Sequence, residues 1–275
     1  MEVIRELLKD TPIPKLIRIR QKFDDTKLEN LPEKLREELK RPGTIDRIKP
    51  GMKIAVAVGS RGVADIVTIV QVTIQAIKDQ GGKPFVVPAM GSHGGATADG
   101  QREVLANLGI TEETIGCPIH SSMEVVEVGK LDNGLSVWAD KIAEEADGIV
   151  VINRVKPHTA FRGTIESGVA KMITIGLGKQ RGADSCHSLS FKYMHEFIVK
   201  MADIKIKRGN ILFGVASVEN AYDIVSMVEA IPAENILKRD AELLEIAKKN
   251  MPRIMFEHID VLLVEKKKKN ISGDG

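Results

Sequence analysis

The sequence predicts an α/β fold, with a Rossmann-like, mostly parallel sheet and helices on both of its faces. Three observations support this fold class. Short apolar runs of strand length alternate with longer segments whose apolar residues recur at helical spacing. The strongest runs, such as Ile149-Val150-Val151-Ile152, lack polar alternation, which is typical of strands buried on both faces. Glycines and polar residues follow directly on several runs, at the edge where such sheets bind ligands.

The elements of the first half follow from apolar spacing and from turn residues. Prolines punctuate the first fifty residues, which we expect to mix helix and extended chain. The next elements end where glycines or prolines interrupt the pattern, and Thr97 is a suitable N-cap. In order, they are a strand over Lys53–Val58, a helix over Ala64–Gln80, a strand over Pro84–Pro88 and a helix from Thr97 to Leu108.

The second half continues the alternation of strands and helices. Asp132-Asn133-Gly134 between two apolar runs is a hairpin signal. The expected elements are hairpin strands over Met123–Val128 and Leu135–Ala139, a strand over Gly148–Asn153, helices near Ile165–Ile175 and from Ser188 to Lys207, a strand over Asn210–Val218, a helix over Ala233–Asn250 and a strand over Ile259–Val264. No internal repeat is present, which excludes a solenoid.

Composition excludes several classes of protein. The 275 residues carry 40 Lys and Arg against 38 Asp and Glu, so there is no basic surplus for nucleic-acid phosphates. Aromatic residues (4%) are too few for a base-stacking platform. Two cysteines, Cys117 and Cys186, cannot form a disulfide framework and favour a reducing compartment. Neither a secretory signal nor a membrane-spanning run is evident. We therefore expect a soluble, cytoplasmic protein that binds neither nucleic acid nor membranes.

Three loops that follow predicted strands carry candidate site residues. Ser60 and Arg61 lie between glycines before a helix, where backbone N–H groups and a guanidinium can bind a phosphate; a tight turn with a solvated arginine explains this loop equally well. His93 stands in a glycine-rich loop, and His158 follows Lys156-Pro157. Imidazoles titrate near neutral pH, and two of them can serve as acid and base on opposite faces of one carbon. For His93 the alternative is a surface turn histidine.

Two further candidates lie after the third of these loops. Lys171 has small and apolar neighbours, a setting that can lower a lysine pKa and make the amine a nucleophile. An exposed helix lysine paired with Glu166 or Ser167 is the alternative. His187 follows Cys186 and suggests a metal ligand, because imidazole suits nickel, zinc or copper. No second cysteine and no paired histidine stands nearby, so a conventional zinc site is unsupported.

Together these residues resemble the nickel-pincer-dependent lactate racemase family, in particular its branch of uncharacterised homologues. Gly91-Ser92-His93 is similar to the family's Gly-Thr-His loop, and His158 to its second catalytic histidine. Gly168-Val169-Ala170-Lys171 is similar to the Gly-x-x-Lys that holds the cofactor, and His187 has the spacing of the nickel ligand. Three departures stand out: the loop at Arg61 lacks the family's Asp-x-x-Arg, Gly94 stands where an arginine is usual, and the interval from His158 to Lys171 is longer than in lactate racemase.

The resemblance implies a racemase or epimerase of a 2-hydroxy acid. Its cofactor would be a nickel-pincer nucleotide, pyridinium-3,5-bisthiocarboxylic acid mononucleotide nickel, attached covalently to Lys171. His93 and His158 would alternate as general base and acid on the substrate hydroxyl, while hydride leaves the α-carbon and returns on either face. The residues implied at the cofactor are Lys171, Ser60, Arg61 and Gly168, with His187 as the nickel ligand.

The resemblance also bears on domain organisation. In the family, a second domain follows and supplies substrate-carboxylate contacts and part of a lid. Residues 1–265 are therefore expected to form the N-terminal cofactor-binding and catalytic domain, and residues 266–275 to begin a hinge to an absent C-terminal domain. On this view the 275-residue chain alone binds cofactor weakly and does not turn over substrate. A frayed natural tail is the alternative.

Three other functions stay open. The first is an enzyme that binds a nucleotide or phosphorylated small molecule at the Arg61 loop without nickel. The second is a non-catalytic cofactor-binding module that keeps Lys171 but not turnover. The third is a zinc protein that uses Cys186 and His187. Neither the identity of the hydroxy acid nor the oligomeric state follows from the sequence.

Overall fold

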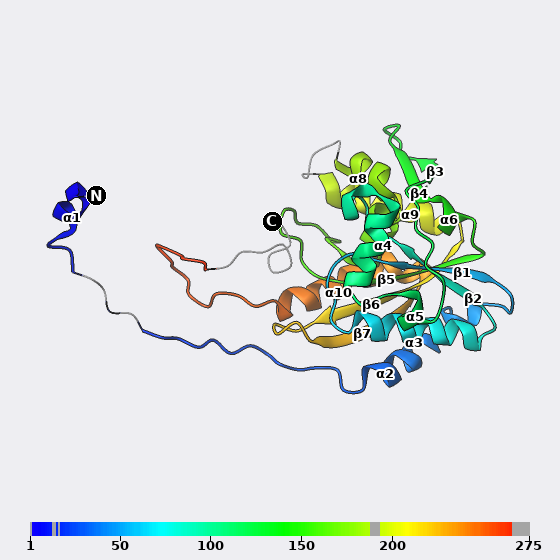
Figure 1. The fold of residues 1–275 in the computed structure, drawn as a ribbon, viewed down its shortest axis with the longest axis horizontal. Coiled ribbons are helices and arrows are strands. Elements are labelled where there is room, and N and C mark those ends of the chain that lie inside the picture. Colours follow the sequence, from blue (N-terminus) through cyan, green and yellow to red (C-terminus); the bar gives the residue numbers. More distant parts are fainter. Residues whose placement is uncertain (1, 13–14, 16, 188–192, 266–275) are drawn as a thin grey trace.

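The central feature of the structure is a five-stranded sheet (Figure 1). A computed structural model describes residues 2–12, 15, 17–187 and 193–265. The strands are β1 (Lys53–Val58), β2 (Lys83–Pro88), β5 (Gly148–Arg154), β6 (Ile211–Glu219) and β7 (Val225–Pro232), in the order β2-β1-β5-β6-β7. All neighbouring pairs are parallel except β6 and β7, which are antiparallel. The mostly parallel sheet confirms the predicted fold class.

Alternate residues of the strands supply two hydrophobic cores, one on each face of the sheet. In β1, Val56 and Val58 belong to one core, whereas Ala55 and Ala57 belong to the other, and all four are fully buried. A strand covered on both faces needs apolar residues at every position, which explains why the sequence of β1 lacks polar alternation.

Helices cover both faces of the sheet. The core that contains Val56 includes residues of α2 (Leu31–Leu39), α3 (Ile66–Asp79), α4 (Ala98–Asn107) and α5 (Glu112–Ile115). The opposite core includes residues of α6 (Lys141–Glu144), α7 (Gly168–Lys171), α9 (Met194–Lys207) and α10 (Ile236–Asn250). The remaining helical segments are α1 (Glu2–Leu8), α8 (Lys179–His187), η1 (Ile45–Arg47), η2 (Gly94–Ala96), η3 (Met172–Gly176) and η5 (Ala233–Asn235).

A separate antiparallel hairpin lies outside the main sheet. Its strands are β3 (Val125–Lys130) and β4 (Ser136–Asp140), as the Asp132-Asn133-Gly134 turn predicts. Gly134 has a φ of 83°, a left-handed conformation that suits glycine. The hairpin packs beside α8 and α9, so it covers the segment that follows Lys171.

The helix predicted near Ile165–Ile175 is shorter and less regular than expected. The helical segment begins with α7 at Gly168 and passes into η3, a turn of π-helix, before α8. Lys205 Nζ donates to the carbonyl of Ile173 at 2.7 Å, which satisfies a backbone group within this wider turn. The predicted start of the next helix at Ser188 lies outside the described residues, and α9 begins at Met194.

Both terminal segments extend away from the body of the molecule (Figure 1). Gln21 links them, because its side chain bonds to the carbonyl of Arg253 (2.8 Å) and to the N–H of Met255 (3.1 Å). The predicted strand over Ile259–Val264 is wrong. The segment is irregular and exposed, and no described strand pairs with it; an apolar run forms a strand only where a neighbouring strand can complete its hydrogen bonds. The predicted hinge at 266–275 lies outside the described residues.

Among the helices of the described residues, none combines sufficient length with sufficient apolar character to cross a bilayer.

Candidate active site

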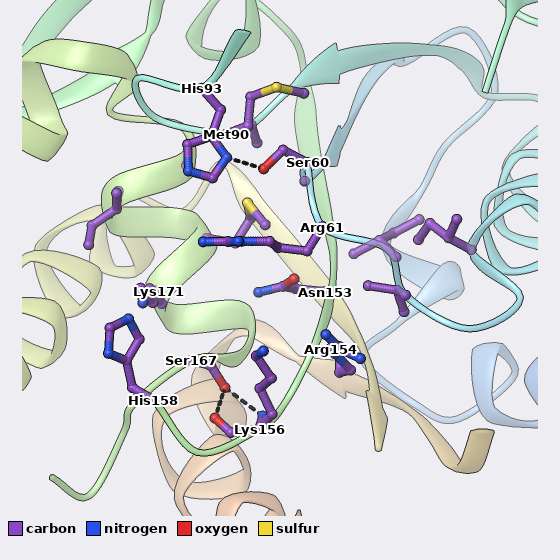
Figure 2. A pocket seen from close by; sticks show the side chains of 18 of the residues that line it. Ser60, Arg61, Met90, His93, Asn153, Arg154, Lys156, His158, Ser167 and Lys171 are labelled. Atoms are coloured by element: carbon purple, nitrogen blue, oxygen red, sulfur yellow. Dashed lines mark hydrogen bonds between the residues drawn. The ribbon is translucent and has the colours of Figure 1, made fainter. Parts of the chain in front are cut away.

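The strand order places a pocket at the carboxyl ends of β1 and β5. The chain passes from β1 to β2 on one side and later enters β5 on the other side of β1, which makes this point a switch in the sheet. Open α/β sheets bind ligands at such points. Loops after β1, β2 and β5, together with α7 and η3, line the pocket (Figure 2). It brings together Ser60, Arg61, His93, Lys156, His158 and Lys171.

The loop after β1 supplies Ser60 and Arg61. Gly59 lets this loop pass close to η3, because a Cβ at that position would lie 2.5 Å from Met172 Cε. Ser60 Oγ and His93 Nδ1 share a hydrogen bond, so the first two loops contact each other directly. Figure 2 shows the Arg61 side chain reaching across the pocket between His93 and Lys171.

A cluster of buried polar side chains, Gln101, Lys179 and Asp140, fixes the His93 loop. Gln101 Nε2 donates to the carbonyls of Gly91 (2.9 Å) and His93 (3.2 Å). Lys179 Nζ donates to Gln101 Oε1 at 3.1 Å and pairs with Asp140 Oδ2 at 3.0 Å. All three side chains are fully buried, so the cluster joins the loop to α8 and β4. Sequence reasoning missed this cluster because lysine and aspartate are usually exposed, and no local pattern marks these two as buried.

His158 lies on the loop after β5 and is held by Glu166. The buried carboxylate of Glu166 accepts the backbone N–H groups of His158 (2.9 Å) and Gly163 (3.2 Å). The His158 ring stacks on Phe161, with ring centroids 4.3 Å apart. His158 Nδ1 accepts the N–H of Ala160 at 3.1 Å, so the neutral imidazole carries its proton on Nε2.

Lys171 ends α7 and is half-buried in the pocket wall. Its Nζ lies 5.3 Å from the centroid of the Phe161 ring. Asp240, on α10, accepts the N–H of Ala170 at 2.6 Å and so supports the first turn of α7. Gly168 has a φ of 84°, and a Cβ there would lie 2.7 Å from the Asp240 carboxyl group. Packing therefore explains Gly168, while its contact with a cofactor stays a prediction.

Among the described residues, those that line the pocket include cations but no carboxylate. Arg154 forms an ion pair with Glu219, which lies behind the wall. Glu219 Oε1 also accepts the N–H of Ala64, just before α3, at 2.8 Å. This backbone donor is therefore satisfied within the protein, and the predicted phosphate contact at this loop rests on the side chains of Ser60 and Arg61. Apolar residues complete the wall: Val63, Ile66, Met90, Ile152 and Ile175.

The predicted metal ligand lies at the end of α8. His187 is the last residue of this helix, and its side chain lies outside the described part of the chain, so its role stays a prediction. Cys186 is buried, with its Sγ 3.5 Å from Met201 Sδ. Burial raises the pKa of the Cys186 thiol to about 11, so the thiol is protonated near neutral pH. Within the described ranges, no three His, Cys, Asp or Glu side chains are grouped to hold a metal.

Comparison with known proteins identifies the family. The family model described as the lactate racemase N-terminal domain matches residues 7–197. The chain belongs to this family. The resemblance to lactate racemases that the sequence motifs indicate is thereby confirmed.

One solved structure shows the same fold. It is the lactate racemase apoprotein from Thermoanaerobacterium thermosaccharolyticum, which matches with a TM-score of 0.54 and 18% sequence identity. The match covers 77% of this chain and 54% of that chain, so this chain spans about half the length of the racemase. No curated protein matches the sequence. The structural similarity confirms the α/β architecture and concerns the fold alone.

Proposed function

We propose that the pocket binds a nickel-pincer mononucleotide and takes part in the racemisation or epimerisation of a 2-hydroxy acid. The observation that carries the proposal is the convergence of Arg61, His93, His158 and Lys171 in one pocket, although they come from separate stretches of the chain. Membership of the lactate racemase N-terminal domain family supports the same class of reaction.

The two histidines suit opposite proton transfers. They lie at opposite ends of the pocket, with Arg61 and Lys171 between them (Figure 2). The Ser60 hydroxyl can donate to or accept from Nδ1 of His93, so Nε2 of His93 can be a base or an acid. His158 presents Nε2–H, because its Nδ1 accepts a backbone N–H. In this state His93 takes the hydroxyl proton as the substrate is oxidised, and His158 returns a proton to the 2-oxo oxygen.

The pocket lining fits the cofactor in two respects. The Lys171 amine lies on the wall, where it can form a covalent link. Ser60 and Arg61 can contact a phosphate, and no lining carboxylate repels an anion. His187 would be the nickel ligand. When bound, the cofactor supplies the centre that accepts hydride from the substrate carbon.

Intact mass spectrometry tests the covalent attachment. Protein from a host that makes the cofactor is expected to exceed its sequence mass, and the excess is expected to vanish in Lys171→Ala. Lys207→Ala, at an exposed ion pair on α9, is the matched control and retains the excess. An unmodified Lys171 peptide in nickel-loaded protein would contradict covalent attachment.

Chiral chromatography of lactate and related 2-hydroxy acids tests the reaction. In a protein that also carries the family's second domain, we expect His93→Gln and His158→Gln each to lower the racemisation rate by roughly 10²–10⁴-fold, the contribution usual for a positioned acid or base. Both variants should keep the mass excess on Lys171. Full activity in either variant would remove that histidine from the mechanism.

A second candidate function is the binding of a nucleotide or phosphorylated small molecule without nickel. The cationic, carboxylate-free lining of the pocket favours this function as well. Metal analysis of the purified protein separates the two candidates. Nickel close to one ion per chain supports the racemase, whereas a metal-free protein that retains a phosphorylated ligand supports the alternative.

A further inference from the structure

We infer that Lys156 is an oxyanion-binding residue of the pocket and that it acts together with Arg61. The ligand class is a small molecule that joins a phosphate or carboxylate group to an apolar or aromatic body. The inference deepens the proposed function and rests on it only for the identity of that molecule.

The main chain of Lys156 is held rigidly. Its N–H donates to Ser167 Oγ at 2.6 Å, and the same hydroxyl donates to the Lys156 carbonyl at 2.6 Å. The preceding residue, Val155, donates to the carbonyl of Ser217 at 2.8 Å, and Pro157 restricts the residue before it. Figure 2 shows the side chain rising from this point into the pocket. The base of the side chain is therefore fixed at the pocket wall before any ligand arrives.

The side chain of Lys156 is half-buried, and its Nζ makes no hydrogen bond or ion pair with any residue that the structure describes. Burial lowers the pKa of Lys156, and the positive charges of Arg154 and Arg61 lower it further. The carboxylates of Glu219 and Asp223 oppose this shift. A bound anion would relieve both the repulsion and the desolvation of the charged amine.

Glu219 compensates the charge of Lys156 only in part, since both of its oxygens already have other partners. Oε2 pairs with Arg154, and Oε1 accepts the N–H of Ala64 at 2.8 Å. The pair of Arg154 with Glu219 is thus internally neutral. The charge of Lys156 faces a pocket whose lining contains no carboxylate.

Two other inward-facing lysines have ammonium groups that bond to the protein itself. Lys179 pairs with Asp140 and donates to Gln101, and Lys205 donates to the carbonyl of Ile173 at 2.7 Å. Both are fully buried and fully engaged with the protein. Lys156 differs from both because its hydrogen-bond donors point into the pocket, where a ligand can accept them.

The affinity of the pocket for an anion should depend on pH. An anion stabilises the charged form of Lys156, so its affinity is expected to fall as pH rises through the lowered lysine pKa. A guanidinium stays charged throughout this range. Lys156→Arg should therefore bind the anion up to higher pH than the natural protein.

Isothermal titration calorimetry on the 275-residue chain tests the inference without nickel. The probes are inorganic phosphate, lactate and nicotinic acid mononucleotide, which joins a phosphate to a pyridinium ring. Lys156→Met is expected to weaken binding by about tenfold or more, as for the loss of a hydrogen bond to a charged group. Lys156→Arg is expected to retain binding, and Lys207→Met, at an exposed ion pair, should change nothing.

The three probes distinguish the source of the oxyanion. Weaker binding of phosphate and mononucleotide assigns Lys156 to a phosphate, whereas weaker binding of lactate assigns it to a substrate carboxylate. Undiminished binding of all three probes to folded Lys156→Met would overturn the inference, as would a natural protein that binds none of them. If Lys156→Met does not fold, the pH profile of Lys156→Arg decides. An unmodified Lys171 would refute covalent attachment but leave these results intact.

Discussion

Two buried carboxyl groups behind the pocket hold the backbone segments that carry candidate site residues. Gly168 has no side chain, which allows the Asp240 carboxyl group to reach the N–H of Ala170 at the start of α7. Glu166 plays the corresponding part for His158 by accepting that residue's backbone N–H. In both cases a buried carboxylate on one segment orders the backbone that carries a candidate site residue.

Substitution of Gly168 should cost more stability than its backbone conformation alone explains. Gly168 and Gly209 have nearly equal positive φ values of 84° and 86°, but a Cβ meets the Asp240 carboxyl group only at Gly168. Gly209→Ala should lower the free energy of unfolding by about 1–2 kcal/mol, the cost of a left-handed conformation. Gly168→Ala should cost about 1–3 kcal/mol more, because it overpacks the contact. Urea unfolding measures both, and equal losses would contradict this account.

Asp240 should make the stability of the domain depend on pH. Burial raises the pKa of Asp240 to about 7 from an ordinary value of 3.8. Between these values the folded state binds the proton more strongly than the unfolded state does, so stability falls as pH rises from about 4 to about 7. Urea unfolding at pH 5 and pH 8 should show a smaller fall in Asp240→Asn than in the natural protein. An identical fall in both would show that Asp240 titrates normally.

At the scale of elements, the loops of the pocket depend on neighbouring segments far away in the sequence. The His93 loop is tied to α8 and β4 through Gln101, Lys179 and Asp140. The loop of His158 and the turn of Lys171 both depend on α10. Asp240 on this helix accepts the N–H of Ala170 beside Lys171, and Lys248 Nζ lies 3.5 Å from Oε1 of Glu166, which holds the His158 loop. Among the described residues, α8, β4 and α10 do not line the pocket, so these segments support the site from outside its wall.

Lys179→Met should destabilise the domain and loosen the His93 loop. The substitution leaves the Asp140 carboxylate buried without its cation, and breaking such a pair typically costs about 3–5 kcal/mol. Adding Asp140→Asn removes the orphaned charge and should restore part of the loss. Hydrogen exchange of residues 91–95 should quicken in Lys179→Met and stay unchanged in the exposed control Lys207→Met. Unchanged exchange in both variants would mean that the cluster does not restrain the loop.

The elements also show what the sequence could and could not predict. Strands buried on both faces have unbroken apolar runs, so β1 and β5 and the loops after them were predictable. Lys179 and Asp240 were not, because a buried ionisable residue has the same local sequence as an exposed one. The run over Ile259–Val264 was misread as a strand, because apolar composition does not reveal whether a partner strand exists. Gly168 and the π-helical turn η3 divided a segment whose spacing predicted one helix.

For the whole molecule, the described terminal segments should be the first to yield to proteases. Residues 17–27 and 251–265 are largely exposed, and Gln21 provides the side-chain link between them. Trypsin at low concentration should cleave after Arg20, Lys22 and Arg253 before it cleaves any site within the sheet and its covering helices. Mass spectrometry of the early fragments measures the order. Early cleavage within residues 53–250 would show that the body of the domain opens more readily than its contacts indicate.

The central position of β5 has a consequence for the order of assembly. This strand pairs with β1, where Ile54 lies opposite Gly148, 94 residues later in the sequence, and with β6, which follows after a further long interval. Contacts between residues so distant in sequence form slowly, since a large loop must close before they give any stability. The pocket needs the ends of β1 and β5 side by side, so it comes into existence only after this long-range pairing has formed. A ligand that contacts both strand ends therefore binds after these two strands have paired.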